Sequence, residues 1–281
     1  RGGPSTGLPT KTEQSDLFAA AYGSHGDNTK VILSVASVED CFYAPHVARY
    51  ITETLKVPVM IMSDYQTSVS YKVLSKLPVH ECTDLSDIPE EVLARFGVTK
   101  FLKEAEMVKH NQSIPGEPDK MRRLTGLNTN AEGKVVYSSE SDQRAHKIRN
   151  NKIHLLRDHH RSLPVMGDDS GDVLIVGWGS SEGTIREVVE YFQIKGQSVS
   201  GMNLKIVMPL PNDLKDVFER YKRVVTVEVT YGDDRKNTPF VTLLRSETLQ
   251  DIQMLVSDAT GRPLNPDLII SKVEAVLEED R

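Results

Sequence analysis

Strand and helix alternate along this sequence, and the strand segments are continuous apolar runs. Residues 30–35 are rich in β-branched side chains and residues 57–62 are wholly apolar, as expected for strands. Such runs are typical of strands that a parallel sheet buries on both faces. Between them Ser37 is a suitable N-cap for a helix over Val38–Leu55. The sequence therefore predicts an α/β fold that begins with a strand–helix–strand unit.

The same alternation returns after residue 170 and predicts a second α/β unit. Gly196 is placed to end its first helix, and Asn265-Pro266 is placed to begin its last. An additional helix over residues 12–22 precedes the first unit. In the second unit we expect strands over residues 172–179, 198–206 and 223–229, and helices over residues 180–195, 212–220 and 264–279.

The stretch between the two units, residues 66–168, has a thin apolar pattern and several prolines. It predicts a short helix over residues 88–96, a small ribbon over residues 128–137 and a long charged helix over residues 142–161. So few apolar residues indicate a connector that has little core of its own and lies on the surfaces of other parts of the protein. We therefore divide the chain into a first domain over residues 1–85, a connector with little core over residues 86–168 and a second α/β domain over residues 169–281.

Composition excludes several classes of protein. The 281 residues carry a net charge of −6, and no apolar run approaches the roughly 20 residues that span a bilayer. Neither nucleic acid nor a membrane is therefore an expected partner. Cys41 and Cys82 are too few for an iron–sulfur cluster, which takes about four cysteines, or for a disulfide framework. We expect a reduced, cytoplasmic setting. Because the sequence starts at Arg1, we also expect it to be part of a longer chain.

The first 16 residues are dense in groups that bind anions. Glycines allow a ligand to approach the backbone closely, and Arg1 and Lys11 supply positive charge. A helix that starts near Thr12 would point its amide N–H groups at the same loop. Two interpretations remain open: an anion-binding loop, or a polar loop that only caps the helix. The loop's hydroxyl groups are those of Ser5, Thr6, Thr10 and Thr12.

Residues 3–14 read Gly-Pro-Ser-Thr-Gly-Leu-Pro-Thr-Lys-Thr-Glu-Gln. This segment resembles the α subunit of 2-oxoacid:ferredoxin oxidoreductases, and in particular the 2-oxoglutarate type. The early part of the family's pattern is missing. Shorter matches follow in the same order to about residue 230: Asp40-Cys41-Phe42, Pro58-Val59 with Ser63-Asp64, Arg123-Leu124-Thr125-Gly126-Leu127, Gly177-Trp178-Gly179-Ser180 and Pro209-Leu210-Pro211.

The resemblance implies the later part of a thiamine-diphosphate pyrimidine-type domain, followed by a transketolase-C-terminal-like α/β domain. Enzymes of this family oxidatively decarboxylate a 2-oxoacid to an acyl-CoA and pass the electrons to ferredoxin. The α subunit shares thiamine diphosphate with a β subunit, which holds Mg²⁺, the diphosphate and a [4Fe-4S] cluster. A heterodimer or a dimer of heterodimers is implied. The glutamate that contacts the cofactor would precede Arg1, so no catalytic residue is assigned within this sequence.

The same resemblance assigns substrate-binding residues. Arg1 is expected to face the carboxylate of the 2-oxoacid, and Thr10 is expected to lie near its far end and to help select the acid. Ser5, Thr6 and Lys11 either line the pocket or only shape the loop.

Other residues have competing interpretations. Gln14 and Asp16 are interpreted as helix-start residues. Asp64 ends a strand, where α/β folds place functional groups, but a capping role is the favoured interpretation. Cys41 is expected to be buried and inert. The basic stretch over residues 144–161 predicts a solvated helix face, with docking of ferredoxin or CoA as the alternative.

Two segments depart from the family's pattern, at residues 128–131 and 228–233. They leave the substrate open between 2-oxoglutarate, which we prefer, and pyruvate. They also leave a second class of function open, a non-catalytic scaffold or interaction module that keeps the fold without the reaction.

Overall fold

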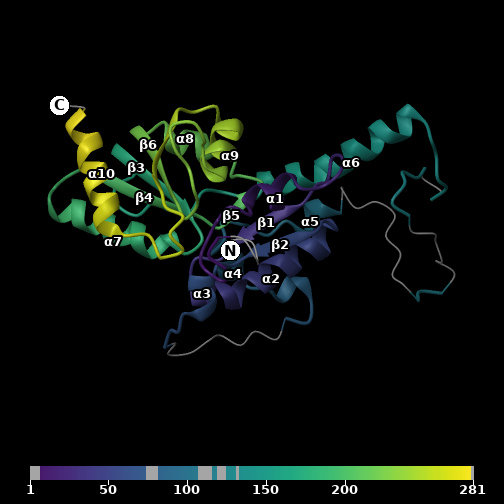
Figure 1. The fold of residues 1–281 in the computed structure, drawn as a ribbon. Coiled ribbons are helices and arrows are strands. Elements are labelled where there is room, and N and C mark those ends of the chain that lie inside the picture. The colour runs from purple at the N-terminus through teal and green to yellow at the C-terminus, as the bar shows by residue number, and fades with distance from the viewer. Residues whose placement is uncertain (1–6, 74–81, 107–115, 119–124, 131–132, 280–281) are drawn as a thin grey trace.

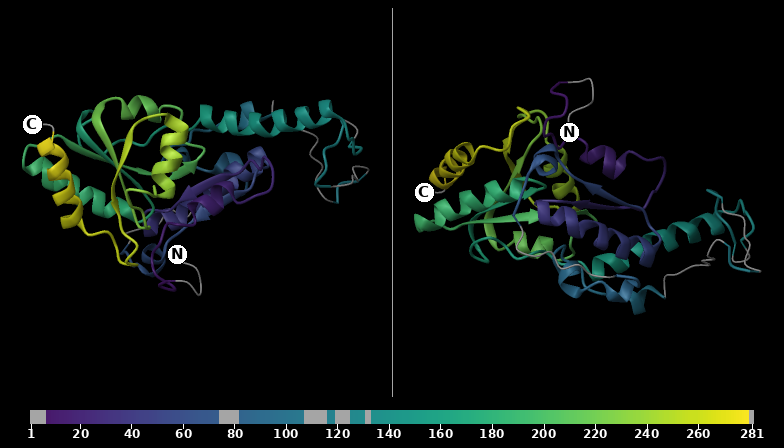
Figure 2. Two further views of the ribbon diagram at one scale, coloured as in Figure 1. Left: turned by 45° about the horizontal axis from the view of Figure 1, so that its top comes forward. Right: turned by 90° about the horizontal axis from the view of Figure 1, so that it is seen from below.

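The computed structural model describes residues 7–73, 82–106, 116–118, 125–130 and 133–279. Within these ranges the chain forms two α/β units side by side, and a long helix, α6 (Ser139–Asp158), extends away from them (Figure 1). Figure 2 shows the projection of α6 from two further directions. The predicted α/β fold class is confirmed.

The first unit contains a three-stranded sheet of order β2-β1-β5. β1 (Val31–Ser34) and β2 (Val59–Met62) run parallel and are joined by α2 (Val38–Leu55), as predicted. Ser37 begins α2 as its cap, because its Oγ accepts a hydrogen bond from the N–H of Asp40 at 3.2 Å.

Burial on both faces was expected for the apolar run of residues 57–62, and for β2 this prediction is wrong. In the part of the chain that the structure describes, β2 is an edge strand, and Ile61 is 41% exposed. β1 lies between two strands and is fully buried. Position in the sheet therefore decides burial, since the wholly apolar run is the more exposed of the two.

The second unit contains a four-stranded parallel sheet of order β4-β3-β6-β7. The helices α7 and α10 cover one face, and α8 and α9 pack against the other (Figure 1). α9 and β7 are not among the predicted elements, although Thr238-Pro239 is a helix-start signal. The elements are β3 (Gly171–Trp178), α7 (Ser181–Ile194), β4 (Val199–Leu204), α8 (Leu214–Phe218), β6 (Tyr221–Glu228), α9 (Pro239–Thr248), β7 (Ile252–Ser257) and α10 (Pro266–Glu279).

The single strand expected over residues 198–206 is divided between the two sheets. β4 ends at Leu204, and β5 (Ile206–Met208) pairs antiparallel with β1 of the first unit. Between them Lys205 Nζ lies 3.0 Å from Oδ1 of Asp40. This ion pair holds the crossover against the start of α2.

The segment between the units contributes more core than predicted. It folds as two short helices, α4 (Glu90–Ala94) and α5 (Leu102–Ala105). Helices of this length are too short for their apolar residues to show a helical repeat in the sequence. The interpretation of residues 86–168 as a connector with little core is therefore wrong for residues 88–105. The residues that this part buries against α2 and β1 are Ile88, Val92, Leu93, Phe96, Val98, Phe101 and Ala105.

The rest of that segment agrees with its predicted elements. The charged helix is α6, and Thr129 and Val135 form the antiparallel bridge of the expected ribbon. The domain boundaries at residues 85 and 168 stay predictions.

The two units share one buried apolar cluster. Leu17, which begins α1 (Leu17–Tyr22), and Ile32 of β1 belong to the same cluster as Trp178 and Phe240 of the second unit. Among the helices of the described ranges, none is both long enough and apolar enough for a membrane crossing.

Candidate functional site

The loop of residues 7–16 lies at the carboxyl ends of strands from both units. Thr12 contacts the segment that follows β2, and Gln14 contacts the last residue of β3 and the residue that follows β6. In α/β proteins ligands bind at this end of the parallel strands. The loop that the sequence singled out as an anion-binding segment therefore occupies a position suited to a ligand site.

Gln14 is buried, with 3% of its surface exposed, and its backbone N–H and both polar atoms of its side chain bind the second unit. Its backbone N–H donates to the carbonyl oxygen of Val229 at 2.7 Å, and its Oε1 accepts from the N–H of Val229 at 2.7 Å. Its Nε2 donates to the carbonyl oxygen of Trp178 at 2.9 Å. The interpretation of Gln14 as a helix-start residue is wrong, because these contacts hold it outside α1.

Asp64 joins the two units from the other side. Its Oδ1 accepts from the N–H of Thr67 at 2.8 Å and so caps α3 (Tyr65–Val69), which agrees with the capping interpretation. Its Oδ2 accepts from the N–H of Ser180, the residue before α7, at 3.1 Å. The carboxylate therefore lies at the amino end of a helix in each unit, where negative charge is favourable.

Gly179 lies where these contacts converge. Its φ is +64°, a left-handed conformation that favours glycine. A Cβ at this position would lie 3.2 Å from Nε2 of Gln14 and 3.5 Å from Oδ2 of Asp64. Glycine is therefore required both by the backbone angle and by the close approach of Gln14.

We expect Gly179→Ala to destabilise the fold by about 1–2 kcal/mol, because an L side chain in the left-handed region costs about that much. Gly183→Ala is the matched control, since Gly183 lies in α7 with no atom within 4 Å of the added Cβ. The control should stabilise slightly, by up to about 1 kcal/mol. Urea-induced unfolding of both variants measures the difference. Equal effects of the same sign would contradict this account of Gly179.

Two recesses flank the loop. The first, of about 220 Å³, opens between the loop and the ends of β1, β2 and β3. Ser34 Oγ at its wall is buried and has no hydrogen-bond partner among the described residues, which is an unusual state for a buried polar atom. The other polar groups of this recess come from Glu13, Gln14, Asp16, Ser63 and Asp64.

The second recess, of about 440 Å³, lies between the loop and residues 259–261. Lys11 lines it, with its ammonium group 6.0 Å from the centre of the Tyr65 ring. The site thus has an acidic recess on one side of the loop and a recess with a lysine on the other.

Of the substrate-binding residues that were predicted, Thr10 and Lys11 lie on the exposed part of the loop. Thr10 has a φ of +59°, which is strained for a β-branched residue, and such strain is common at functional sites. Arg1, Ser5 and Thr6 lie outside the described residues.

The prediction that a helix begins near Thr12 is wrong. α1 begins at Leu17 and has six residues, with Asp16 at its N-cap position. The amide groups of residues 12–14 are therefore not the first turn of a helix aimed at the loop. Thr12 is instead buried, and its Oγ1 accepts from the N–H of Gln66 at 3.2 Å.

Two buried titratable groups lie near the junction of the units. Glu228 ends β6, is fully buried, and accepts hydrogen bonds from the N–H of Phe240 at 3.2 Å to each oxygen. Burial raises the pKa of Glu228 to about 7. His160 is 3% exposed, and burial lowers the pKa of its imidazole to about 4.

Cys41 is exposed, so the expectation that it is buried is wrong. It lies on the outer side of the first turn of α2, and partial desolvation raises the pKa of its thiol. Within the described ranges, no group of three or more His, Cys, Asp or Glu side chains could hold a metal ion.

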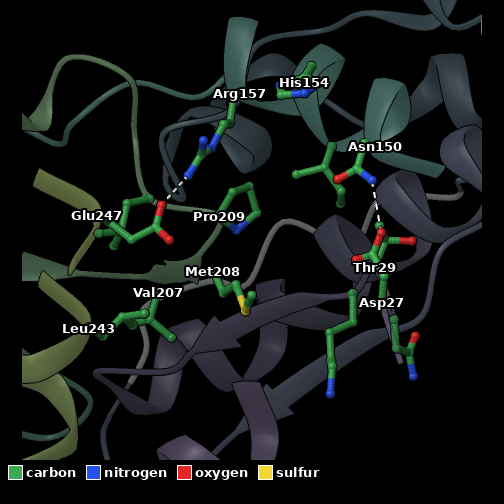
Figure 3. Close-up of a pocket in the computed structure, with 14 residues that line it drawn as sticks. Asp27, Thr29, Asn150, His154, Arg157, Val207, Met208, Pro209, Leu243 and Glu247 are labelled. Atoms are coloured by element: carbon green, nitrogen blue, oxygen red, sulfur yellow. Dashed lines mark hydrogen bonds and ion pairs between the residues drawn. The ribbon is translucent and has the colours of Figure 1, made fainter. Parts of the chain in front are cut away.

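A separate cavity of about 210 Å³ lies at the amino end of β1, away from the loop of residues 7–16. Figure 3 shows two polar contacts on opposite sides of it, with Met208 and Pro209 between them. Arg157 donates to Glu247 at 2.6 Å on one side, and Asn150 donates to Asp27 at 3.0 Å on the other. These contacts fix α6 to both units, and the length of β1 separates this cavity from the candidate site.

Comparison with known proteins places both units in one class of protein. The family described as "Pyruvate flavodoxin/ferredoxin oxidoreductase, thiamine diP-bdg" matches residues 1–109, and "Pyruvate:ferredoxin oxidoreductase core domain II" matches residues 171–262. The fold and the loop at its strand ends thus define a subunit of the pyruvate and 2-oxoacid oxidoreductase class.

Individual relatives identify the family more closely. The 2-oxoglutarate oxidoreductase subunit KorA of Mycobacterium tuberculosis is 32% identical, and the alignment covers 100% of this chain and 43% of that protein. The 2-oxoglutarate synthase subunit KorA of Methanocaldococcus jannaschii is 26% identical, over 83% of this chain and 61% of that protein. The chain belongs to the family of 2-oxoacid:ferredoxin oxidoreductase α subunits, as its resemblance predicted.

A solved structure supports the same assignment. The 2-oxoglutarate:ferredoxin oxidoreductase of Magnetococcus marinus, determined with 2-oxoglutarate, coenzyme A and succinyl-CoA bound, matches with a TM-score of 0.76 at 27% identity. The match covers 99% of this chain and 47% of that chain. The chain therefore spans less than two thirds of the length of each of these relatives.

Proposed function

We propose that this chain is part of the α subunit of a thiamine-diphosphate-dependent 2-oxoacid:ferredoxin oxidoreductase that acts on 2-oxoglutarate. The observation that carries the proposal is the loop of residues 7–16, which holds Thr10 and Lys11 at the carboxyl ends of strands from both units. The choice of 2-oxoglutarate rests on the relatives named for that acid and on the match to a structure with 2-oxoglutarate bound.

The chemistry of the acidic recess supports a division of the cofactor between two chains. Glu13, Asp16 and Asp64 line it, and neither lysine nor arginine is among its described lining residues. Such a lining would repel a diphosphate, but its carboxylate and hydroxyl oxygens can accept hydrogen bonds from an amine-bearing ring. The described residues therefore fit the pyrimidine half of thiamine diphosphate, and the diphosphate with its Mg²⁺ is assigned to a partner β subunit. Bound thiamine diphosphate supplies the carbanion that attacks the keto carbon of the acid.

In this proposal the chain's own residues bind and orient the 2-oxoacid. Arg1 holds the carboxylate that leaves as CO₂, because a guanidinium can bind a carboxylate through two parallel hydrogen bonds. Thr10 contacts the far end of the acid. The ammonium group of Lys11 adds positive charge in the recess of about 440 Å³ beside the loop.

The proposal also assigns electron transfer to the partner. The sequence has two cysteines, fewer than the about four that a [4Fe-4S] cluster takes. We assign the cluster to the β subunit, ferredoxin as electron acceptor and CoA as the second substrate.

The test is an anaerobic assay of the gene product that contains this sequence, co-expressed with the adjacent β subunit. We expect CoA-dependent reduction of a viologen dye with 2-oxoglutarate, and weaker or no reduction with pyruvate or a branched-chain 2-oxoacid. A complex that contains thiamine diphosphate and clusters but reduces no dye with any of the three would contradict the proposal and would favour a non-catalytic scaffold.

In the same assay Arg1→Ala should lower kcat/KM for 2-oxoglutarate by about 10- to 100-fold, mainly through KM. The reason is that a charged hydrogen bond is worth roughly 1.5–3 kcal/mol. Arg186→Ala is the control, since Arg186 is exposed on α7 and lies outside the basic stretch of residues 144–161. Unchanged kcat/KM in Arg1→Ala would remove Arg1 from the substrate site.

A further inference from the structure

The loop that carries Thr10 is anchored by two alternate residues, one to each unit. Thr12 contacts the first unit through the N–H of Gln66 at 3.2 Å. Gln14 contacts the second unit through Trp178 and Val229. Side chains two residues apart point to opposite units, so the loop bridges the interface between them.

Gln14 forms hydrogen bonds at the ends of two strands of the second sheet. Its backbone N–H and its side-chain Oε1 bind the carbonyl oxygen and the N–H of Val229, the residue that follows β6, at 2.7 Å each. Its Nε2 binds the carbonyl oxygen of Trp178, the last residue of the adjacent strand β3, at 2.9 Å. One side chain therefore spans the ends of two neighbouring strands.

A neutral side chain of this length that carries both a donor and an acceptor satisfies both partners. The carbonyl oxygen of Trp178 accepts from Nε2 of Gln14 and from Oγ of Ser181, at 2.9 Å each, and the N–H of Val229 donates to Oε1 of Gln14, so the side chain must both donate and accept. An ionised glutamate has the right length but cannot donate. Asparagine has both groups but is one methylene shorter. The side chain is 3% exposed, so water cannot replace a lost contact at little cost.

We propose that Gln14 is a positioning residue for the 2-oxoacid: by fixing the loop of residues 7–16 to the ends of β3 and β6, it sets where Thr10 meets the substrate. This inference rests on the function proposed above. Gln14 borders the acidic recess, but both polar atoms of its side chain bind Trp178 and Val229, so in this account it acts through the loop that it holds. Thr10 lies four residues before it, in a strained backbone conformation that needs such support.

The first test is Gln14→Glu in the assembled complex, with KM and kcat measured separately. At pH 8 the carboxylate faces the carbonyl oxygen of Trp178, so we expect KM for 2-oxoglutarate to rise about tenfold. We expect kcat and KM for CoA to change less than about threefold, because the loop places the acid and not the second substrate. The control is Gln193→Glu, which makes the same chemical change on the exposed surface of α7.

A pH series distinguishes positioning from general damage. In the Gln14→Glu variant, the protonated form of the introduced carboxyl group can donate to Trp178 and accept from Val229, as the native amide does. Burial at this position should raise the pKa of the introduced carboxyl group, as it does for Glu228. KM of Gln14→Glu, relative to wild type at the same pH, should therefore fall towards 1 as the pH is lowered from 8 to 6. A ratio that does not change with pH would overturn the inference.

A double variant tests the route of action. If Gln14 acts through Thr10, then Gln14→Glu should raise KM for the acid much less in a Thr10→Ala background. Additive effects of the two substitutions would overturn the proposal. If Gln14→Glu does not assemble, Gln14→Asn is the milder variant for the same cycle. Loss of 2-oxoacid-dependent reduction in the wild-type complex would instead contradict the proposed function, so the two failures are distinguishable.

Discussion

Asp40→Ala is expected to destabilise the protein by about 3–5 kcal/mol, because it removes the nearest partner of a buried positive charge, the ammonium group of Lys205, whose next carboxylate is that of Glu182 at 3.9 Å. Asp40 is fully buried and accepts hydrogen bonds from Arg95 Nε at 2.8 Å and from Lys205 Nζ at 3.0 Å. It also accepts from the N–H of Ala36 at 3.2 Å. Lys205 is only 11% exposed, so water cannot replace the lost carboxylate.

The position of Asp40 explains the size of this effect. Arg95 follows α4, and Lys205 lies between β4 and β5, where the chain passes from the second sheet to the first. One carboxylate therefore fixes three parts of the fold. We expect the crossover at Lys205 to loosen in the variant, which should appear as faster amide hydrogen exchange in β5.

Glu39→Gln is the matched control, since Glu39 is the preceding residue of α2 and binds the same arginine at 3.0 Å. Its side chain is 28% exposed, and such partly solvated pairs contribute about 0–1 kcal/mol. Urea-induced unfolding followed by circular dichroism measures both variants. Equal losses of stability would show that burial is not what makes Asp40 important.

Local signals in the sequence were sufficient to predict several elements. α2 occupies the predicted range, Val38–Leu55, because its N-cap, its acidic first turn and its apolar spacing all depend on neighbouring residues. The adjacent strands β1 and β2 were predicted for the same reason. Agreement between local preference and final structure is strongest where one helix and its flanking strands form a unit by themselves.

Features that depend on distant residues could not be predicted. The strand predicted over residues 198–206 continues through the point where the chain changes sheets, and the break is stabilised by Asp40, 165 residues earlier. Gln14 lies where a helix start was expected, but its partners Trp178 and Val229 are 164 and 215 residues away. No pattern within the loop identifies them.

The candidate site was predicted in part. The segment of residues 1–16 was identified from its glycines, hydroxyl groups and charges, and the structure places its described part, residues 7–16, at the carboxyl ends of the strands. The roles of Thr10 and Lys11 stay predictions, and Arg1, Ser5 and Thr6 lie outside the described residues. The second anchor of the site, Asp64, was interpreted as a local cap, and its contact with Ser180 joins segments 116 residues apart.

Glu228→Gln is expected to stabilise the protein progressively as the pH rises. The pKa of this carboxyl is about 7 in the folded protein against an ordinary value of 4.5. The folded state therefore prefers the protonated form, and the wild type loses stability as the pH rises from 4.5 through 7. At 1.36 kcal/mol per pKa unit, the variant should gain about 3 kcal/mol relative to wild type over this range. Its Oε1 can still accept from the N–H of Phe240, which preserves the start of α9.

His160 is the opposite case, because burial lowers its pKa. It therefore tests whether burial is the cause of both pKa shifts. Burial lowers the pKa of its imidazole from 6.5 to about 4, so the wild type loses stability as the pH falls through this range. His160→Gln should therefore gain stability relative to wild type on acidification, by about 3 kcal/mol. Between pH 4.5 and 6.5 the two groups have opposite effects on the wild type: as the pH rises, Glu228 lowers the stability and His160 raises it. Unfolding of each variant and the wild type over pH 4.5–7.5 measures them separately. The stability difference between variant and wild type could change with pH in the same direction for both variants, or in neither. Either result would show that burial of these groups does not control their protonation.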